Sequence, residues 1–165
     1  MAHRYDHPRP ALTTDIVLVR EGAGQVEVLL IQRRHDPFVG EWALPGGFVD
    51  EGEDLEESAR RELQEETEVT GVSLHQLGAF GEPGRDPRGW VVSVAFWTWL
   101  EGEVSVRAAD DAADARWWPL DALPALAFDH GLILQRALER IREVRRLQGQ
   151  SPAPLPRALG FRPVA

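Results

Sequence analysis

The most informative stretch of the chain runs from residue 46 to residue 69 and reads GGFVDEGEDLEESARRELQEETEV. Between Asp50 and Glu68 it carries ten acidic and two basic residues, whereas the rest of the chain is almost neutral. The net charge of −9 is therefore concentrated in one segment. Such a segment should repel nucleic-acid backbones and attract cations.

Residues 54–70 are strong helix formers without glycine or proline, so this segment predicts a helix. On a helix that turns ~100° per residue, Glu62, Glu65 and Glu66 share an arc of roughly 100°. The apolar positions that form the inward face lie beside that arc: Leu55, Ala59 and Leu63. A solvated acidic face would leave the three glutamates unexplained, because like charges next to buried apolar residues repel and are costly to desolvate. A bound cation would remove that cost.

The residue types select the kind of cation. Carboxylates without cysteine or clustered histidine favour a hard, oxygen-seeking ion. Mg²⁺ is therefore the expected cofactor, with Mn²⁺ as a possible substitute. Mg²⁺ in such sites usually also binds the phosphates of a substrate.

The segments around the acidic helix predict strands and one further helix. Residues 14–20 and 26–33 are expected to form a hairpin through a turn at 21–24. A second helix is expected after Asp129 as N-cap, with an apolar stripe that reaches Val144. Further strands are expected at 72–80, 91–100 and 115–118. This order predicts an α/β fold, a sandwich with a largely mixed sheet.

Composition removes several kinds of chemistry. Cysteine is absent and all 18 basic residues are arginine, so disulfides, thiolate metal sites, cysteine nucleophiles and lysine Schiff bases are excluded. No apolar run approaches the ~18 residues of a membrane span, and the N-terminal residues lack the apolar stretch of a signal peptide. We expect a cytoplasmic protein without a membrane partner.

The length of 165 residues predicts one domain with a sizeable core. We expect this domain to cover residues 13–148, after an N-terminal extension at 1–12. Residues 149–165 are rich in proline and are expected to form a flexible C-terminal tail.

The spacing of Gly47, Glu53 and the run Arg61–Thr67 resembles the Nudix box of the Nudix hydrolases, Gly-x5-Glu-x7-Arg-Glu-U-x-Glu-Glu-x-Gly-U with U apolar. The resemblance implies the Nudix-type α/β/α sandwich with a mixed sheet and hydrolysis of a nucleoside diphosphate linked to another group. It also implies a role for each matched residue. Glu62, Glu65 and Glu66 would hold the metal, the Gly46 carbonyl would add a ligand, and Arg61 would orient the carboxylates with Glu53 as its partner.

One position departs from the family pattern. Glu68 stands where the Nudix box has the glycine that ends the helix. Because Gly71 follows three residues later, we expect the helix to run on by most of a turn and to end there.

A second passage, residues 84–96, resembles the corresponding segment of bacterial ADP-ribose pyrophosphatases. Arg85 and Arg88 are the bases of this loop, and guanidinium groups suit phosphate oxygens, so both are expected to bind substrate. The alternative is a surface arginine that pairs with Asp86 or Glu82. The aromatic candidates for stacking on adenine are Trp90 and Trp42, with a place in the core as the alternative. His130 is expected to be simply a residue at the start of the second helix.

The resemblance implies hydrolysis of ADP-ribose to AMP and ribose 5-phosphate. The expected general base is Glu65, with Asp110 or Asp111 of a later loop as the alternative. Two other functions fit the motif: hydrolysis of a nucleoside triphosphate, and a non-catalytic ADP-ribose-sensing regulator. Since no basic reading helix follows the second helix, nucleic acid is not an expected partner. A homodimer is expected from the resemblance alone.

Overall fold

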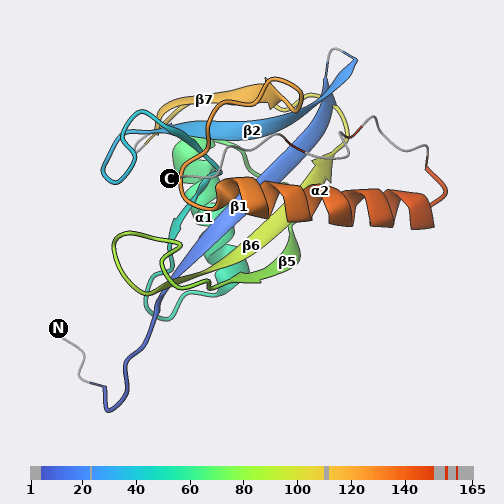
Figure 1. Ribbon diagram of the computed structural model, residues 1–165. Coiled ribbons are helices and arrows are strands. Elements are labelled where there is room, and N and C mark those ends of the chain that lie inside the picture. Colours follow the sequence, from blue (N-terminus) through green and yellow to red (C-terminus); the bar gives the residue numbers. More distant parts are fainter. Residues whose placement is uncertain (1–4, 23, 110–111, 151–154, 156–158, 160–165) are drawn as a thin grey trace.

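The computed structural model describes residues 5–22, 24–109, 112–150, 155 and 159. Its strands and helices follow one another along the chain as Figure 1 shows. In order they are β1 (Ala11–Gly22), β2 (Gln25–Arg33), β3 (Trp42–Ala43), β4 (Gly46–Phe48), α1 (Leu55–Thr67), β5 (His75–Phe80), β6 (Val91–Leu100), β7 (Ala112–Pro119) and α2 (His130–Leu147). Among these described residues, neither helix is long and apolar enough to cross a membrane.

The seven strands form one mixed sheet whose central path runs β3-β2-β1-β6-β5. β1 and β2 pair antiparallel, which confirms the predicted hairpin, and β1 runs parallel to β6 over its first ten residues. The short strand β4 also pairs with β1, and β7 pairs with β2. β1 therefore lies at the centre of the sheet and contacts the segment that carries the two adjacent glycines.

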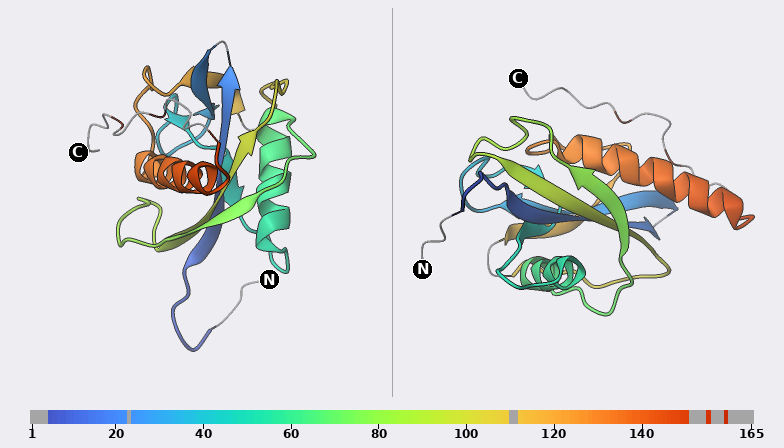
Figure 2. Two further views of the ribbon diagram at one scale, coloured as in Figure 1. Left: turned by 90° about the vertical axis from the view of Figure 1, so that its right-hand side faces the viewer. Right: turned by 90° about the horizontal axis from the view of Figure 1, so that it is seen from below.

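The two helices cover opposite faces of this sheet (Figure 2). Because side chains alternate along a strand, Ile16 and Leu18 of β1 face α1, whereas Val17 and Val19 face α2. On the α1 side these residues pack with Ala59 and Leu63 of that helix, and on the α2 side with its apolar stripe of Ile133, Leu134, Ala137, Leu138 and Ile141. The predicted α/β/α sandwich with a mixed sheet is confirmed.

The predicted end of the acidic helix is wrong. Helix α1 begins after Asp54, whose carboxylate caps the N-H groups of Glu56 and Glu57, but it ends at Thr67 instead of reaching Gly71. Glu68 itself adopts the left-handed conformation, with φ of 60°. The last carbonyls of the helix accept from the loop before β7, from Arg107 N to Thr67 O and from Ala109 N to Glu66 O. The chain must also turn here so that the buried Val69 reaches the core on the α1 side.

The other predicted elements differ at their ends. The strand expected from residue 72 begins only at His75, and the strand expected at 115–118 extends over Ala112–Pro119. Strand β6 matches its prediction. Asp129 precedes α2 as expected, but its side chain makes no capping hydrogen bond. Most of the predicted C-terminal tail lies outside the described residues.

Candidate active site

The two glycines at the start of β4 stand where α1 and β1 approach the same backbone. At Gly46, which has φ of +153°, a Cβ atom would lie 2.0 Å from the carbonyl oxygen of Thr14. At Gly47, a Cβ atom would lie 2.4 Å from the carboxylate of Glu62. A side chain at Gly46 would therefore collide with the backbone of β1, whereas a side chain at Gly47 would displace the carboxylate of Glu62.

Two glutamates of α1 lie against this glycine turn. Glu66 is 8% exposed and its Oε2 accepts a hydrogen bond from the Gly46 N-H at 2.9 Å. Its burial raises the pKa of the carboxyl to about 8, and the negative charges of Glu62 and Asp15 act in the same direction. The pKa of Glu62 is raised as well, chiefly by burial. For both carboxylates, the protein groups that favour the ionised form do not fully offset the cost of burial.

Arg61 connects the loop before the helix with the carboxylates on it. Its guanidinium donates two hydrogen bonds to Glu53, at 2.8 and 2.9 Å, and one to Glu62 at 2.7 Å. It also contacts Glu65 at 3.3 Å and the Phe48 carbonyl at 3.1 Å. The hydrogen bonds from Arg61 lower the pKa of Glu53 to about 2. This arginine therefore fixes the loop and holds two of the three glutamates at once.

The three glutamates differ in where their side chains point. Glu62 and Glu66 reach the glycine turn, whereas the side chain of Glu65 is 48% exposed and turns to Arg61. In the described part of the chain, no three acidic or histidine side chains are grouped closely enough to form a ready metal site. The donor chemistry nonetheless fits a hard divalent cation, because the partly buried Glu62 and the buried Glu66, both with raised pKa, lie beside the Gly46–Gly47 backbone.

A small polar pocket of about 50 Å³ opens on the other side of the same turn. Two arginines flank the ring of Phe128 in it, with the guanidinium carbons of Arg33 and Arg88 at 4.9 and 5.4 Å from the ring centroid. The pKa of Arg33 is lowered by burial and by the positive charge of Arg88. Arg33 and Arg88 are two of the three arginines that line this pocket beside Gly46 and Gly47, and their guanidinium groups suit an anion, although Arg88 is paired with Asp86 in this structure.

The predicted substrate residues lie in different surroundings. Arg85 is 4% exposed and donates to both oxygens of Asp129, at 2.9 and 2.6 Å. Arg88 pairs with Asp86, which was the alternative to substrate binding in the sequence analysis. Its side chain is 37% exposed and lines the pocket. Trp90 is 56% exposed.

Other predicted residues lie away from the pocket or outside the description. Trp42 packs edge-to-face on Trp118, with ring centroids 5.0 Å apart, next to the core on the α2 side. Asp110 and Asp111, the alternative general bases, lie outside the described residues.

Three residues that line this pocket escaped the sequence analysis as site residues, namely Asp15, Arg33 and His130, and so did Asp129, which pairs with the pocket residue Arg85. The sequence offered one signal for Asp15, an acidic residue directly before the apolar run of a predicted strand, and the structure shows that this side chain is buried. The others are ordinary polar residues at strand and helix ends. Only their arrangement in space sets them apart.

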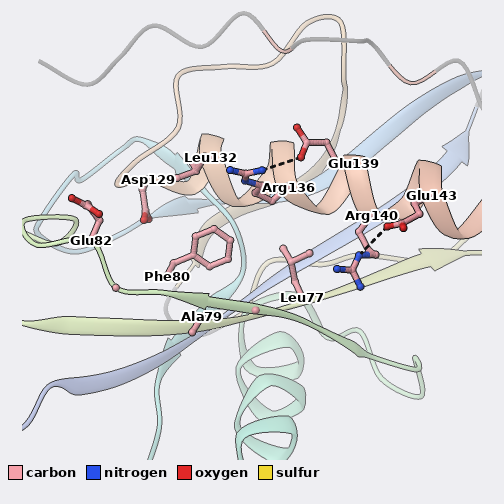
Figure 3. Close-up of a pocket in the computed structure, with 12 residues that line it drawn as sticks. Leu77, Ala79, Phe80, Glu82, Asp129, Leu132, Arg136, Glu139, Arg140 and Glu143 are labelled. Atoms are coloured by element: carbon pink, nitrogen blue, oxygen red, sulfur yellow. Dashed lines mark hydrogen bonds and ion pairs between the residues drawn. The ribbon is translucent and has the colours of Figure 1, made fainter.

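A larger groove of about 570 Å³ lies between β5 and α2 (Figure 3). Leu77 and Phe80 point from β5 toward the helix, and the charged residues along the helix form the ion pairs Arg136–Glu139 and Arg140–Glu143. The groove ends at Asp129, which is also the partner of Arg85. It lies on the α2 side of the sheet, and none of the α1 glutamates lines it.

Comparisons with known proteins agree with this geometry. The chain is 41% identical over 126 residues to an ADP-ribose pyrophosphatase of Methanocaldococcus jannaschii, a match that covers 76% of this chain and 72% of that protein. It is 37% identical over 140 residues to the ADPR responsive transcriptional repressor NtrR of Acinetobacter baylyi, covering 82% of this chain and 56% of the repressor.

A solved structure is similar as well. The Nudix domain of Shewanella oneidensis NrtR, crystallised with ADP ribose, superposes with a TM-score of 0.75 at 37% identity and covers 83% of this chain and 94% of that chain. The family model of the NUDIX domain matches residues 9–138, and Nudix hydrolases generally use divalent metal ions. With the box residues gathered around the glycine turn, this chain belongs to the NUDIX family.

Proposed function

We propose that this protein hydrolyses the diphosphate linkage of ADP-ribose, releasing AMP and ribose 5-phosphate. The observation that carries the proposal is the pair of carboxylates at the glycine turn, the partly buried Glu62 and the buried Glu66, next to a pocket that Arg33 and Arg88 line. A cation-binding position and an anion-binding position thus share one short backbone segment. The similarity to the pyrophosphatase of M. jannaschii supports the choice of substrate.

In the proposed reaction, Mg²⁺ would be held by Glu62, Glu65, Glu66 and the Gly46 carbonyl, and Mn²⁺ would be able to substitute for it. The metal would lower the pKa of bound water and neutralise charge on the phosphates. Water adds to one phosphorus, the bond from that phosphorus to the bridging oxygen breaks, and the bridging oxygen leaves with the other phosphate. Arg33 and Arg88 hold the diphosphate oxygens.

The remaining residues of the box prepare the reacting groups. Arg61 keeps the carboxylates of Glu62 and Glu65 on one side of the helix, and Glu53 fixes Arg61 in turn. Glu65 is the proposed general base, because its side chain is exposed to solvent and lies away from the glycine turn, where a water molecule can reach its carboxylate. Asp110 and Asp111 are the alternative bases.

A substrate screen tests the proposal. Purified protein is incubated with ADP-ribose and, separately, with a panel of nucleoside triphosphates, with Mg²⁺ or Mn²⁺, and products are separated by ion-exchange chromatography. AMP and ribose 5-phosphate from ADP-ribose are the expected products. Pyrophosphate release from a triphosphate at a higher kcat/KM would instead assign the protein to nucleotide-pool hydrolysis.

The similarity to NtrR supports a second candidate, an ADP-ribose-binding regulator that does not hydrolyse its ligand. Binding of ADP-ribose without turnover, together with a ligand-dependent gel shift of DNA, would favour that candidate. We predict no shift, since nucleic acid is not an expected partner. A homodimer and a cytoplasmic location also stay predictions, which light scattering and cell fractionation test.

A further inference from the structure

His130, the first residue of α2, is buried against the turn that leads into the two glycines. Its Nδ1 accepts a hydrogen bond from the backbone N-H of Leu44 at 2.9 Å, and its Nε2 lies 3.2 Å from Oδ1 of Asp15. The side chain is 6% exposed. Burial lowers the pKa of this imidazole.

These two contacts define one tautomer of the ring. Since Nδ1 accepts from a backbone N-H, the single proton of the neutral imidazole must sit on Nε2 and point to Asp15. Asp15 is held in place by the hydroxyl of Ser93, which donates to Oδ2, and by Arg85 at 3.8 Å. The acceptor atom aimed at Leu44 is therefore fixed in position by a buried set of partners.

The segment that His130 holds is the approach to the candidate metal site. Three successive backbone groups of this segment have partners on different elements. The Leu44 N-H donates to His130 of α2, the Pro45 carbonyl accepts from Ile16 N of β1 at 2.8 Å, and the Gly46 N-H donates to Glu66 of α1 at 2.9 Å. Both helices, from opposite faces of the sheet, thus reach one turn of three residues.

We propose that His130 is a positioning residue, which holds the Leu44–Gly46 turn from the α2 side so that the Gly46 backbone faces Glu66. The inference rests on the proposed function for its kinetic consequence, because the Gly46 carbonyl is a proposed metal ligand. Loss of the Leu44 hydrogen bond would let the turn move away from α1. Metal affinity and kcat should then fall, while the arginines that bind the diphosphate keep their places.

Three substitutions separate the two ring nitrogens. His130→Asn keeps an acceptor near the place of Nδ1, His130→Gln keeps a donor near the place of Nε2, and His130→Ala keeps neither. The matched control is His75→Asn, because His75 is an exposed histidine of β5 that stacks on Trp97 at the far edge of the sheet. Each variant is measured by amide hydrogen exchange at Leu44 and Gly46, by Mn²⁺ binding without substrate, and by kcat and KM for ADP-ribose.

For His130→Gln and His130→Ala we expect about tenfold faster exchange at both amides, about tenfold weaker Mn²⁺ binding and a similar loss in kcat, with KM within about twofold. His130→Asn and the control should stay close to wild type. Wild-type protection of Gly46 in the Gln and Ala variants would overturn the proposal, as would an Asn variant as impaired as the Ala variant.

The two proposals can fail separately. If wild-type protein neither binds Mn²⁺ nor hydrolyses ADP-ribose, the proposed function is wrong. The positioning role is then tested by amide exchange at Gly46 alone. Faster exchange in the Gln and Ala variants would still support it, and wild-type protection in these variants would overturn it.

Discussion

Two charged clusters lie on either side of the Gly46–Gly47 turn, and they are built differently. The Arg61 cluster, made of Arg61 with Glu53, Glu62 and Glu65, is held by hydrogen bonds between side chains at most eight positions apart in the sequence, within α1 and the loop before it. The Asp15 cluster, made of Asp15, Arg85, Ser93, Asp129 and His130, joins β1, β6, the loop at Arg85 and the start of α2 through contacts between residues 44 to 115 positions apart. The first is half open to solvent, whereas the second is buried.

The difference in exposure and pairing indicates which role each cluster can have. Partly exposed carboxylates near one arginine can exchange partners, as binding of a cation and a substrate requires. Buried charges that are fully paired with distant elements resist displacement, because removal of one leaves its partner uncompensated in the interior. We therefore expect substitutions in the Arg61 cluster to lower mainly the activity. Substitutions in the Asp15 cluster should lower mainly the free energy of unfolding.

The largest effect is expected for Glu66→Gln, which neutralises the most buried carboxylate of the box. It should lower kcat/KM for ADP-ribose by on the order of 10³-fold, because the proposed metal loses a charged ligand. Steady-state assays over a range of Mg²⁺ concentrations measure this. Activity within tenfold of wild type at saturating Mg²⁺ would remove Glu66 from the proposed ligand set.

The same substitution also has a pH-dependent effect on stability. Because the pKa of Glu66 is raised from 4.5 to about 8 on folding, the folded state binds an extra proton in that window and the free energy of unfolding falls as pH rises through it. Metal-free Glu66→Gln should therefore gain stability relative to wild type from pH 5 to pH 8, by about 1 kcal/mol or more. Thermal unfolding in the presence of EDTA measures the difference, and a constant difference across this range would contradict the raised pKa.

Arg85→Gln should lower stability far more than it lowers substrate binding. It breaks a bidentate pair with Asp129 and leaves that carboxylate without its partner, which costs about 3 kcal/mol for buried pairs. Urea unfolding measures the loss. Arg33→Gln is the comparison within the same pocket and should instead raise KM about tenfold. If Arg85→Gln raised KM without loss of stability, Arg85 would belong with the substrate residues after all.

Arg61→Lys should lower kcat by about ten- to a hundredfold, because a lysine cannot contact Glu53 and Glu62 with the same fork geometry. The free energy of unfolding should change little, since the cluster is partly exposed. The matched control is Arg60→Lys, at a neighbouring arginine that faces solvent and pairs with Glu56. Equal kinetics for the two variants would show that Arg61 has no special role.

The smallest effect is expected for Glu68→Gly, and it is a gain in stability. Glycine relieves the left-handed conformation at φ of 60° and removes a negative charge from the C-terminal end of α1, so stability should rise by about 1 kcal/mol. A rise in Tm of a few degrees is the expected readout. A fall in Tm would mean that the Glu68 side chain itself supports the turn.

Much of the α1 half of the site follows from spacing alone. A helix fixes the angle between residues three or four apart, so the shared arc of Glu62 and Glu66, and the place of Arg61 next to them, can be predicted from their positions. The end of the helix could not be predicted in this way. Thr67 and Glu66 give their carbonyls to a loop forty residues later, and that contact stops the helix before Gly71.

The pairings in the Asp15 cluster could not be predicted, because they form only when distant segments meet in the folded sheet. Arg85 was predicted as a phosphate ligand from its charge and its loop, but a charge does not reveal which carboxylate will lie next to it after folding. Asp129 was predicted as a helix cap for the same local reason, and it bonds to Arg85 instead. His130 looked like any residue at a helix start, although it lies between Leu44 and Asp15.

The amino-acid sequence by itself determined the family, the acidic helix with its glycine turn, and the class of chemistry, because these depend on residue types at short, regular separations. Only the tertiary structure decided which charges are buried and paired across the sheet, and which stay open at the pocket. Those pairings depend on contacts between segments that meet only when β1 takes its central place and the two helices close over its opposite faces.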